Sequence, residues 1–224
     1  FMTFFCSLLG ILSALIGPYG PIFFIDFIHT ILYNIYKERE KEVFYMSVWV
    51  VSDTHLNHTR IMEYCPDTRD FSCVEDMNEA IINRWNDRIS PDDIVYHLGD
   101  VCMGQLDTID KYLPRLNGHI TLIKGNHDTK GRIARIQEVV GWEVLNIECI
   151  RYNDINFLMM HKKSEDMHGN SENVILYGHV HDAAPHGLQP DWTYHVGLDT
   201  NNLAPVNLHD IWIDVQEQRI KTGE

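Results

Sequence analysis

The sequence predicts an α/β fold for the chain from Met46 onward, on two observations. Short apolar runs of strand length alternate with segments whose apolar residues recur at helical spacing. Apolar residues make up 45% of the chain and charged residues 22%, as in a soluble globular protein. The 224 residues are enough for one domain with a sizeable core, or for one domain plus an appendage.

The first half of this domain predicts strands and helices in alternation. The apolar run 47–51 predicts a buried strand that ends at the polar sequence SDTH. Residues 74–88 place apolar side chains at helical spacing after an acidic first turn, which predicts a helix. The other predicted elements are strands over 94–98 and 120–123 and a short helix over 106–116.

The second half predicts one helix, followed mostly by strands. The sequence GRIARIQEVV predicts a helix over 131–140. Five further strands are predicted, over 144–150, 155–160, 174–178, 193–199 and 211–219. No internal repeat, low-complexity segment or linker follows Met46, so residues 46–224 are predicted to form one α/β domain.

Residues 1–45 form a separate hydrophobic extension with two open interpretations. Residues 4–25 contain no charge and are long enough to span a bilayer, which favours a membrane anchor. Pro18, Gly20 and Pro21 would break such a span, and Met46 would make a natural initiator, which favours an upstream artefact. A secretory signal fits poorly, because no basic n-region and no clear cleavage site are present.

The charge balance is acidic, with 32 acidic and 18 basic residues and a net charge of −14. Residues 46–224 alone carry 28 acidic and 15 basic residues, a net charge of −13. We therefore expect no duplex nucleic acid as a partner, because that needs a broad basic face. A small phosphate ester stays compatible, since a bound metal brings its own positive charge.

The five cysteines are widely spaced and form no CxxC pair, which argues against a zinc ribbon or a thioredoxin-like site. Free thiols indicate a reducing compartment. We therefore expect a cytoplasmic protein, or a membrane-anchored one if residues 1–45 are a real anchor.

Polar side chains follow five of the predicted strands. They are Asp53 and His55, Asp100, Asn126 and His127, His161, and His179 and His181. In layered α/β folds, sites gather at the ends of strands, where loops converge. In extended chain, residues two apart point to the same side, so the D-x-H and H-x-H spacings each predict a pair that can face one ion.

Two carboxylates, four imidazoles and one amide oxygen give seven candidate ligands, too many for one four-coordinate zinc ion. The set suits two ions that share a bridging carboxylate. Oxygen and nitrogen ligands without thiolate favour Mn, Fe, Zn, Co or Ni over Ca or a cysteine-bound zinc. The sequence therefore predicts a dinuclear metal site at the strand ends.

The blocks SDTH, HLGDV, KGNHD, MMH and YGHVH, in this order, resemble the motifs of the calcineurin-like metallophosphoesterase superfamily. The match covers nearly all of residues 47–200. The small size resembles the compact bacterial and phage members, which lack a cap domain. The resemblance implies a four-layer α/β/β/α sandwich with the dinuclear site at its strand ends.

The resemblance also implies a role for each site residue. Asp53, His55 and His181 would hold the first metal ion. Asn126, His161 and His179 would hold the second, and Asp100 would bridge both. His127 would face the substrate as the catalytic residue, where it would stabilise the transferring phosphoryl group or protonate the leaving oxygen.

The implied activity is hydrolysis of a phosphodiester or phosphomonoester by a hydroxide that bridges two divalent transition metal ions, with Mn preferred. One alternative is a non-catalytic metal-binding scaffold of the same fold. A second alternative is a nuclease that acts on short single strands. The sequence leaves the substrate, the native metal pair and the oligomeric state open.

Three further residues have an open role in the site. His58 and Arg60 can touch the substrate phosphate, or they form a solvated helix start. Asp128 can orient His127, lie behind the ligands, or cap the helix that follows it.

Four other residues have simpler expectations. His97 is expected in the core, and His195, Asp199 and Asn201 are candidates for the pocket wall.

Overall fold

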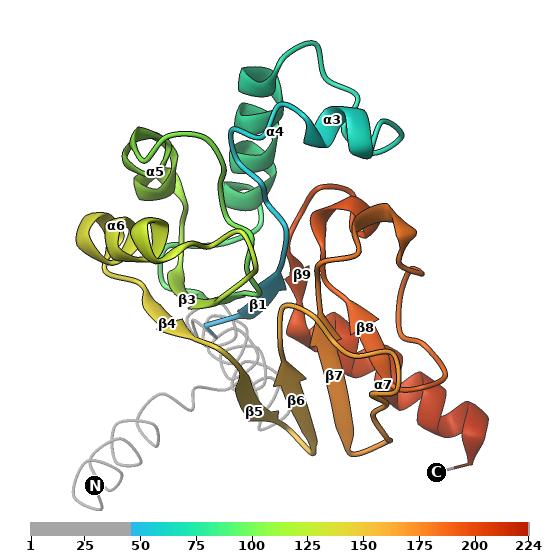
Figure 1. Cartoon of the computed structure of the whole chain (residues 1–224). Helices are drawn as coiled ribbons and strands as arrows, with labels where there is room; N and C mark the ends of the chain where they lie inside the picture. The colour runs from blue at the N-terminus through green and yellow to red at the C-terminus, as the bar shows by residue number, and fades with distance from the viewer. Residues whose placement is uncertain (1–45, 224) are drawn as a thin grey trace, which may run out of the picture. The chain divides into compact units, whose positions relative to one another are not determined.

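A computed structural model describes residues 46–223, which form two β-sheets and the helices around them (Figure 1). The hydrophobic extension of residues 1–45, with its two interpretations as anchor or artefact, lies outside the described residues. Across residues 46–223, no helix is long and apolar enough to cross a membrane.

The first sheet has the strand order β4-β3-β2-β1-β9. Its strands are β1 (Val48–Val51), β2 (Ile94–His97), β3 (His119–Ile123), β4 (Glu143–Leu145) and β9 (Val206–Asn207). Strands β1 to β4 run parallel, and β9 pairs antiparallel with β1. The carboxyl ends of β1, β2 and β3 therefore meet at one edge, and the loops that leave them lie side by side.

The second sheet has the order β5-β6-β7-β8. Its strands are β5 (Glu148–Tyr152), β6 (Ile155–Met159), β7 (Asn173–Tyr177) and β8 (Thr193–His195). Strands β5 and β6 form an antiparallel hairpin, whereas β6, β7 and β8 run parallel. The two sheets share an inner core that joins Val50 and Ile123 of the first sheet to Phe157 and Leu176 of the second.

Helices α4 (Val74–Asn86), α5 (Asp107–Tyr112) and α6 (Lys130–Val140) cover the outer face of the first sheet (Figure 1). A second apolar core joins Trp85, Ile109 and Ile136 of these helices to Val95 and Leu122 of the sheet. The short elements are α3 (Ile61–Tyr64) and three 3₁₀ turns: η1 (Leu113–Arg115), η2 (His181–Ala183) and η3 (Leu198–Thr200). The predicted α/β class, with two sheets and flanking helices, is confirmed.

The strand predicted over 211–219 is wrong, because this segment lies in helix α7 (Leu208–Thr222). The segment contains β-branched residues, which favour strands, but its buried residues recur at helical spacing. Leu208, Ile211 and Val215 pack into the inner core. Asn207 caps the amino end by accepting a hydrogen bond from the amide of His209, and Gly223 ends the helix in the left-handed conformation.

The single strand predicted over 144–150 is two strands in two sheets. Strand β4 ends at Leu145 and belongs to the first sheet, whereas β5 begins at Glu148 in the second. Ile147 lies in the connection and is exposed, so the apolar run crosses from one sheet to the other. The strand predicted over 193–199 is shorter than expected. Strand β8 ends at His195, and the 3₁₀ turn η3 follows it.

Candidate metal centre

The loops after β1, β2, β3, β6 and β7 meet between the two sheets. The amides of Asp53 and His55 donate to the carbonyls of Gly99 and Asp100, each at 3.0 Å, which fixes the first loop against the second. From the other sheet, the amide of Gly178 donates to the carbonyl of His161 at 2.9 Å. The amide of His127 donates to Oδ1 of Asp100 at 2.7 Å, and the amide of His179 donates to Oδ2 of Asp53 at 2.8 Å. Together these bonds place the polar ends of five strands in one region.

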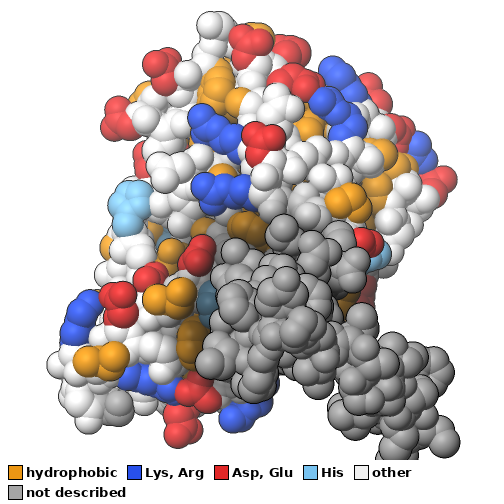
Figure 2. Space-filling model, turned by 180° about the vertical axis from the view of Figure 1, so that it is seen from behind, with side chains coloured by type: hydrophobic (Ala, Val, Ile, Leu, Met, Phe, Trp, Pro, Cys, Tyr) orange, Lys and Arg blue, Asp and Glu red, His pale blue; other side chains and the backbone are white. Residues whose placement is uncertain are grey.

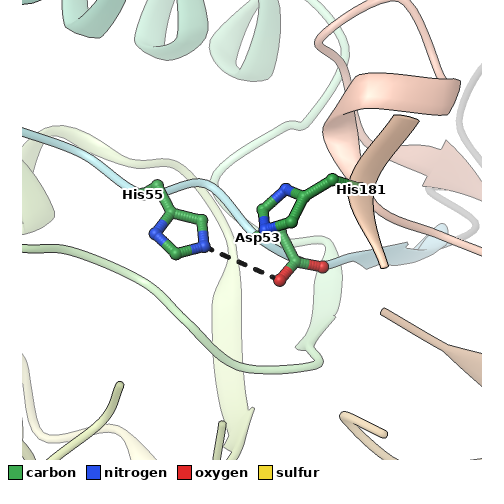
Figure 3. A group of neighbouring side chains, drawn as sticks. All are labelled: Asp53, His55 and His181. Carbon is green, nitrogen blue, oxygen red and sulfur yellow. Dashed lines mark ion pairs between the residues drawn. The ribbon is translucent and has the colours of Figure 1, made fainter. Parts of the chain in front are cut away.

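The loops form a first ligand group from Asp53, His55 and His181 (Figure 3). One ligand atom from each lies within 4.8 Å of the others. Nε2 of His55 is 3.8 Å from Oδ1 of Asp53. This group is the set predicted for the first metal ion.

A second group contains Asp100, His161 and His179, whose ligand atoms also lie within 4.8 Å of one another. Nε2 of His161 lies 2.8 Å from Oδ1 of Asn126, so the predicted amide ligand borders this group. Nδ1 of His161 lies 2.7 Å from the carbonyl of Leu98 and can donate to it. That bond leaves Nε2 free to bind a cation.

The Asp100 carboxylate lies between the two groups. Its Oδ2 is 3.3 Å from Nε2 of His161 and 3.7 Å from Nε2 of His55. Burial alone would raise the pKa of Asp100, but the hydrogen bond and charge of His161 and the amide of His127 lower it to about 2. Asp100 is therefore ionised at neutral pH and faces both groups, as a bridging ligand must.

Unpaired buried atoms show that this centre fits a cation. Among the described residues, Oδ1 of Asp53 and both ring nitrogens of His55 are buried without a hydrogen-bond partner. Unpaired buried polar atoms are rare, because each one costs about 1–3 kcal/mol. Burial raises the pKa of Asp53 and, with the Arg69 charge, lowers that of His55 well below its usual value. A divalent cation would bind Oδ1 of Asp53 and one ring nitrogen of His55, and it would offset the cost of burying the Asp53 carboxylate.

Five of the seven predicted ligands have a positive φ, which is uncommon outside glycine. The values are 59° for Asp53, 46° for His55, 59° for Asp100, 77° for His179 and 50° for His181. The D-x-H and H-x-H pairs are therefore not in extended chain. The expectation that extended chain turns both residues of each pair to the same side is wrong. The left-handed backbone turns each ligand into the site, and such strain clusters at functional sites.

Gly125 makes room for the Asp100 carboxylate. A Cβ at this position would collide with Oδ1 of Asp100 and lie 2.5 Å from its backbone nitrogen. Only glycine lets the loop after β3 approach the bridging side chain this closely.

Asp128 holds the two loops that carry Asp100 and Asn126. Its buried carboxylate accepts hydrogen bonds from the amides of Asp100 at 2.8 Å, Val101 at 3.2 Å and Gly125 at 2.9 Å. The helix-cap interpretation is wrong, because Thr129 caps α6. Within residues 46–223 no hydrogen bond joins the Asp128 side chain to His127, so Asp128 acts on the loops behind the ligands.

We predict that Asp128→Asn lowers the free energy of unfolding of the metal-free protein by about 1–3 kcal/mol. The asparagine has one acceptor oxygen for three amides, and its NH₂ faces donors. Chemical denaturation measures the change, with the exposed Asp92→Asn as control. Equal stability of the variant and the wild type would contradict the role assigned to this carboxylate.

His127 stands at the open side of the centre. Its side chain is 44% exposed, and its Nε2 is 4.0 Å from Oδ2 of Asp100. The amide of His127 donates to Oδ1 of Asp100 at 2.7 Å, which fixes the backbone beside the bridging ligand. Its ring centroid is 5.6 Å from that of His55. The imidazole can therefore contact a group bound at the metal centre from the solvent side.

The structure separates His58 from Arg60. The ring of His58 lies 5.1 Å from that of His55, and burial, followed by the charge of His127, lowers its pKa. Arg60 is exposed at the amino end of α3, where its side chain forms no hydrogen bond or ion pair with any residue in 46–223. His58 thus borders the site and Arg60 stands on its rim.

His97 lies in the core, as expected. It is fully buried, accepts a hydrogen bond from the amide of Gly99 at 3.2 Å and pairs with Oγ1 of Thr54 at 2.9 Å. Burial lowers its pKa to about 3. His195 is also buried, with a pKa lowered to about 4 by burial and by the charge of His181. Both rings are therefore neutral at pH 7.

A third cluster of possible ligands contains Cys65, His181 and Asp199. Burial and the charges of Asp199 and Asp182 raise the pKa of Cys65 to about 11, so its thiol stays protonated at neutral pH. Asp199 is already paired with Arg69, with Nε 2.7 Å from Oδ1. This cluster is therefore no thiolate site. Arg69 was not predicted from the sequence, where it stands in an ordinary polar loop.

Two sheets, with loops of aspartate and histidine at the carboxyl ends of their strands, define an α/β protein with candidate metal-ligand groups at these strand ends. The chain belongs to the calcineurin-like phosphoesterase superfamily, whose domain model matches residues 46–193.

The chain is also similar to three other proteins. An uncharacterized protein of Methanocaldococcus jannaschii is 33% identical over 167 residues, which is 72% of this chain and 86% of that protein. The gene 66 protein of Mycobacterium phage D29 is 25% identical over 205 residues, 76% of this chain and 98% of its own length. A solved protein of unknown function from Aquifex aeolicus shares the fold, with a TM-score of 0.59, 21% identity, and coverage of 74% of this chain and 97% of its own.

Proposed function

We propose that this phosphoesterase hydrolyses a phosphodiester at a centre of two divalent transition metal ions, with Mn preferred. One observation carries the proposal. A single oxygen of Asp100, Oδ2, faces imidazoles from three loops: His55 at 3.7 Å, His161 at 3.3 Å and His127 at 4.0 Å. Two of these belong to the two ligand groups, and the third reaches the solvent side.

The chain would hold one ion with Asp53, His55 and His181, the other with Asn126, His161 and His179, and both with Asp100. When bound, such ions supply positive charge for the phosphoryl oxygens and a water that ionises near neutral pH. His127 would donate a hydrogen bond to the phosphoryl group or a proton to the leaving oxygen. The buried ligands would exclude bulk water from the side of the metal centre that faces the core.

A cavity beside the second ligand group supports a diester. It measures about 420 Å³ and includes His179 in its wall. Its wall also contains the charged residues Lys162, Lys163 and Glu165, and Tyr177, Val180 and Pro185 supply apolar surface. A monoester places one organic group at the centre, whereas a diester places two. The cavity gives the second group a place next to the metal ligands.

We predict that Lys162→Gln and Lys163→Gln each raise the KM for an anionic diester about two- to fivefold, as expected for partly exposed charges. The turnover number should stay unchanged, because neither lysine is in a ligand group. Steady-state kinetics with bis-p-nitrophenyl phosphate measures both constants, and the exposed Lys130→Gln is the control. A fall in turnover at unchanged KM would contradict a role in substrate binding.

Two alternatives have less support. A non-catalytic scaffold would need neither an intact ligand set nor a histidine at the solvent side, and both are present here. A nuclease that binds extended strands would favour a basic groove, whereas residues 46–224 have a net charge of −13. On the face shown in Figure 2, acidic and basic side chains of the described residues are interspersed. The cytoplasmic location and Mn as the preferred metal stay predictions, and the oligomeric state stays open.

Hydrolysis assays test the proposal. With Mn added to metal-free protein, we expect release of p-nitrophenol from bis-p-nitrophenyl phosphate, faster than from p-nitrophenyl phosphate. No turnover with Mn, Fe, Zn, Co or Ni in folded protein would overturn the proposed activity. Faster cleavage of short oligonucleotides than of simple diesters would favour the nuclease alternative.

A further inference from the structure

Arg69 is fully buried in the loop between α3 and α4. Its guanidinium binds both oxygens of Asp199, with Nε 2.7 Å from Oδ1 and an Nη 3.0 Å from Oδ2. It also donates to the carbonyls of Thr54 at 3.1 Å and Asp53 at 2.6 Å. A buried arginine is costly unless its charge and donors are satisfied. Arg69 meets this condition by linking two loops.

Those two loops carry ligands of the same group. The carbonyls of Asp53 and Thr54 belong to the loop after β1, which holds the ligands Asp53 and His55. Asp199 lies in η3 and accepts a hydrogen bond from Nδ1 of His181 at 2.8 Å. That bond fixes the ring so that Nε2 keeps its lone pair for a cation. Arg69 therefore connects Asp53 to His181.

The second ligand group is supported in another way. Nδ1 of His161 has the backbone carbonyl of Leu98 as its partner, which no side-chain substitution removes. The carboxylate of Asp128 holds the backbone of the Asp100 and Gly125 loops, again without Arg69 or Asp199. The two groups thus differ in what orients them.

We infer that Arg69 and Asp199 are a positioning pair that sets the affinity of the first ligand group, and not the second, for its metal ion. The inference rests on the metal centre of the proposed function. Asp199 orients the His181 ring, and Arg69 locks Asp199 to the backbone of the Asp53 loop. Losing the pair leaves every ligand present but unaligned, so one of two ions should bind more weakly.

The test uses Arg69→Lys, Asp199→Asn and Thr68→Val. Lysine keeps the charge of Arg69 but loses the two-pronged contact and the paired carbonyl bonds. Thr68→Val removes one hydrogen bond to Asp199, from Oγ1 at 2.9 Å, and is the mildest change. Arg88→Lys is the control, because Arg88 donates to the carbonyl of Pro205 at 2.9 Å and, among the described residues, forms no hydrogen bond or ion pair with a predicted ligand.

Calorimetric titration of metal-free protein with Mn measures both affinities. We expect Arg69→Lys and Asp199→Asn to weaken one of the two ions about 10- to 100-fold, as is usual for residues behind metal ligands. Thr68→Val should weaken the same ion less, and Arg88→Lys should weaken neither. The increase in Tm on adding Mn should shrink in the variants, whereas a purely structural role would lower Tm equally with and without metal.

Unchanged affinity for both ions in folded Arg69→Lys and Thr68→Val overturns the inference, whether or not Asp199→Asn folds. Equal weakening of both ions overturns its selectivity for the first group. A wild-type chain that binds two ions but hydrolyses no ester overturns the proposed function alone. A wild-type chain that binds no transition metal overturns both.

Discussion

Asp100→Asn should lower the turnover of phosphodiesters by about a thousandfold or more. The substitution keeps the size of the side chain and an oxygen that can accept the hydrogen bond from the amide of His127. It removes the negative charge that faces His55 at 3.7 Å and His161 at 3.3 Å. Loss of one bridging charge between two divalent ions costs several kcal/mol, and about 4 kcal/mol corresponds to a thousandfold in rate.

Metal analysis separates this cause from unfolding. We expect elemental analysis to find at most one tightly bound ion per chain in Asp100→Asn, against two in the wild type, while circular dichroism stays the same. Asp110→Asn is the matched control, because Asp110 is exposed and pairs with Arg135, away from the site. Two bound ions and full turnover in Asp100→Asn would show that this carboxylate does not bridge the groups.

The ligand-bearing loops could be predicted from the sequence because each follows a buried strand. Apolar runs followed by Asp, Asn or His predicted both where the strands end and which residues are candidate ligands. The structure brings those side chains together. Backbone conformation could not be predicted in this way. The positive φ of Asp53 and His55 depends on hydrogen bonds to the Gly99 and Asp100 carbonyls, more than forty residues away.

Two further features depend on distant contacts. Helix α7 contains β-branched residues with strand preference, and it is a helix because Leu208, Ile211 and Val215 meet the inner core on one face. Arg69 looks like a surface residue in its local sequence. It is buried because its partner Asp199, 130 positions away, neutralises it. The helical spacing of the three apolar residues in α7 is a local sequence signal, whereas the burial of Arg69 has none.

His127→Ala should lower the turnover number by about 10²- to 10⁴-fold, the usual contribution of a residue that assists proton transfer. His127 lies in no ligand group, so we expect two bound ions per chain in the variant. Its side chain is also 44% exposed, so its removal leaves no core cavity. The exposed His119→Ala, at the start of β3, is the control and should have wild-type turnover. Unchanged turnover in His127→Ala would remove this residue from the mechanism.

A leaving-group series then distinguishes the two roles open to His127. A proton donor matters most when the leaving oxygen is basic, because p-nitrophenolate departs without a proton whereas a more basic oxygen needs one. A hydrogen bond to the phosphoryl oxygens acts equally on every ester. The rate loss in His127→Ala should therefore grow from p-nitrophenyl to phenyl esters if the imidazole protonates the leaving oxygen. A constant loss would assign it to the phosphoryl group. Its place 4.0 Å from Oδ2 of Asp100, on the solvent side, is compatible with either contact, so the slope of this series decides between them.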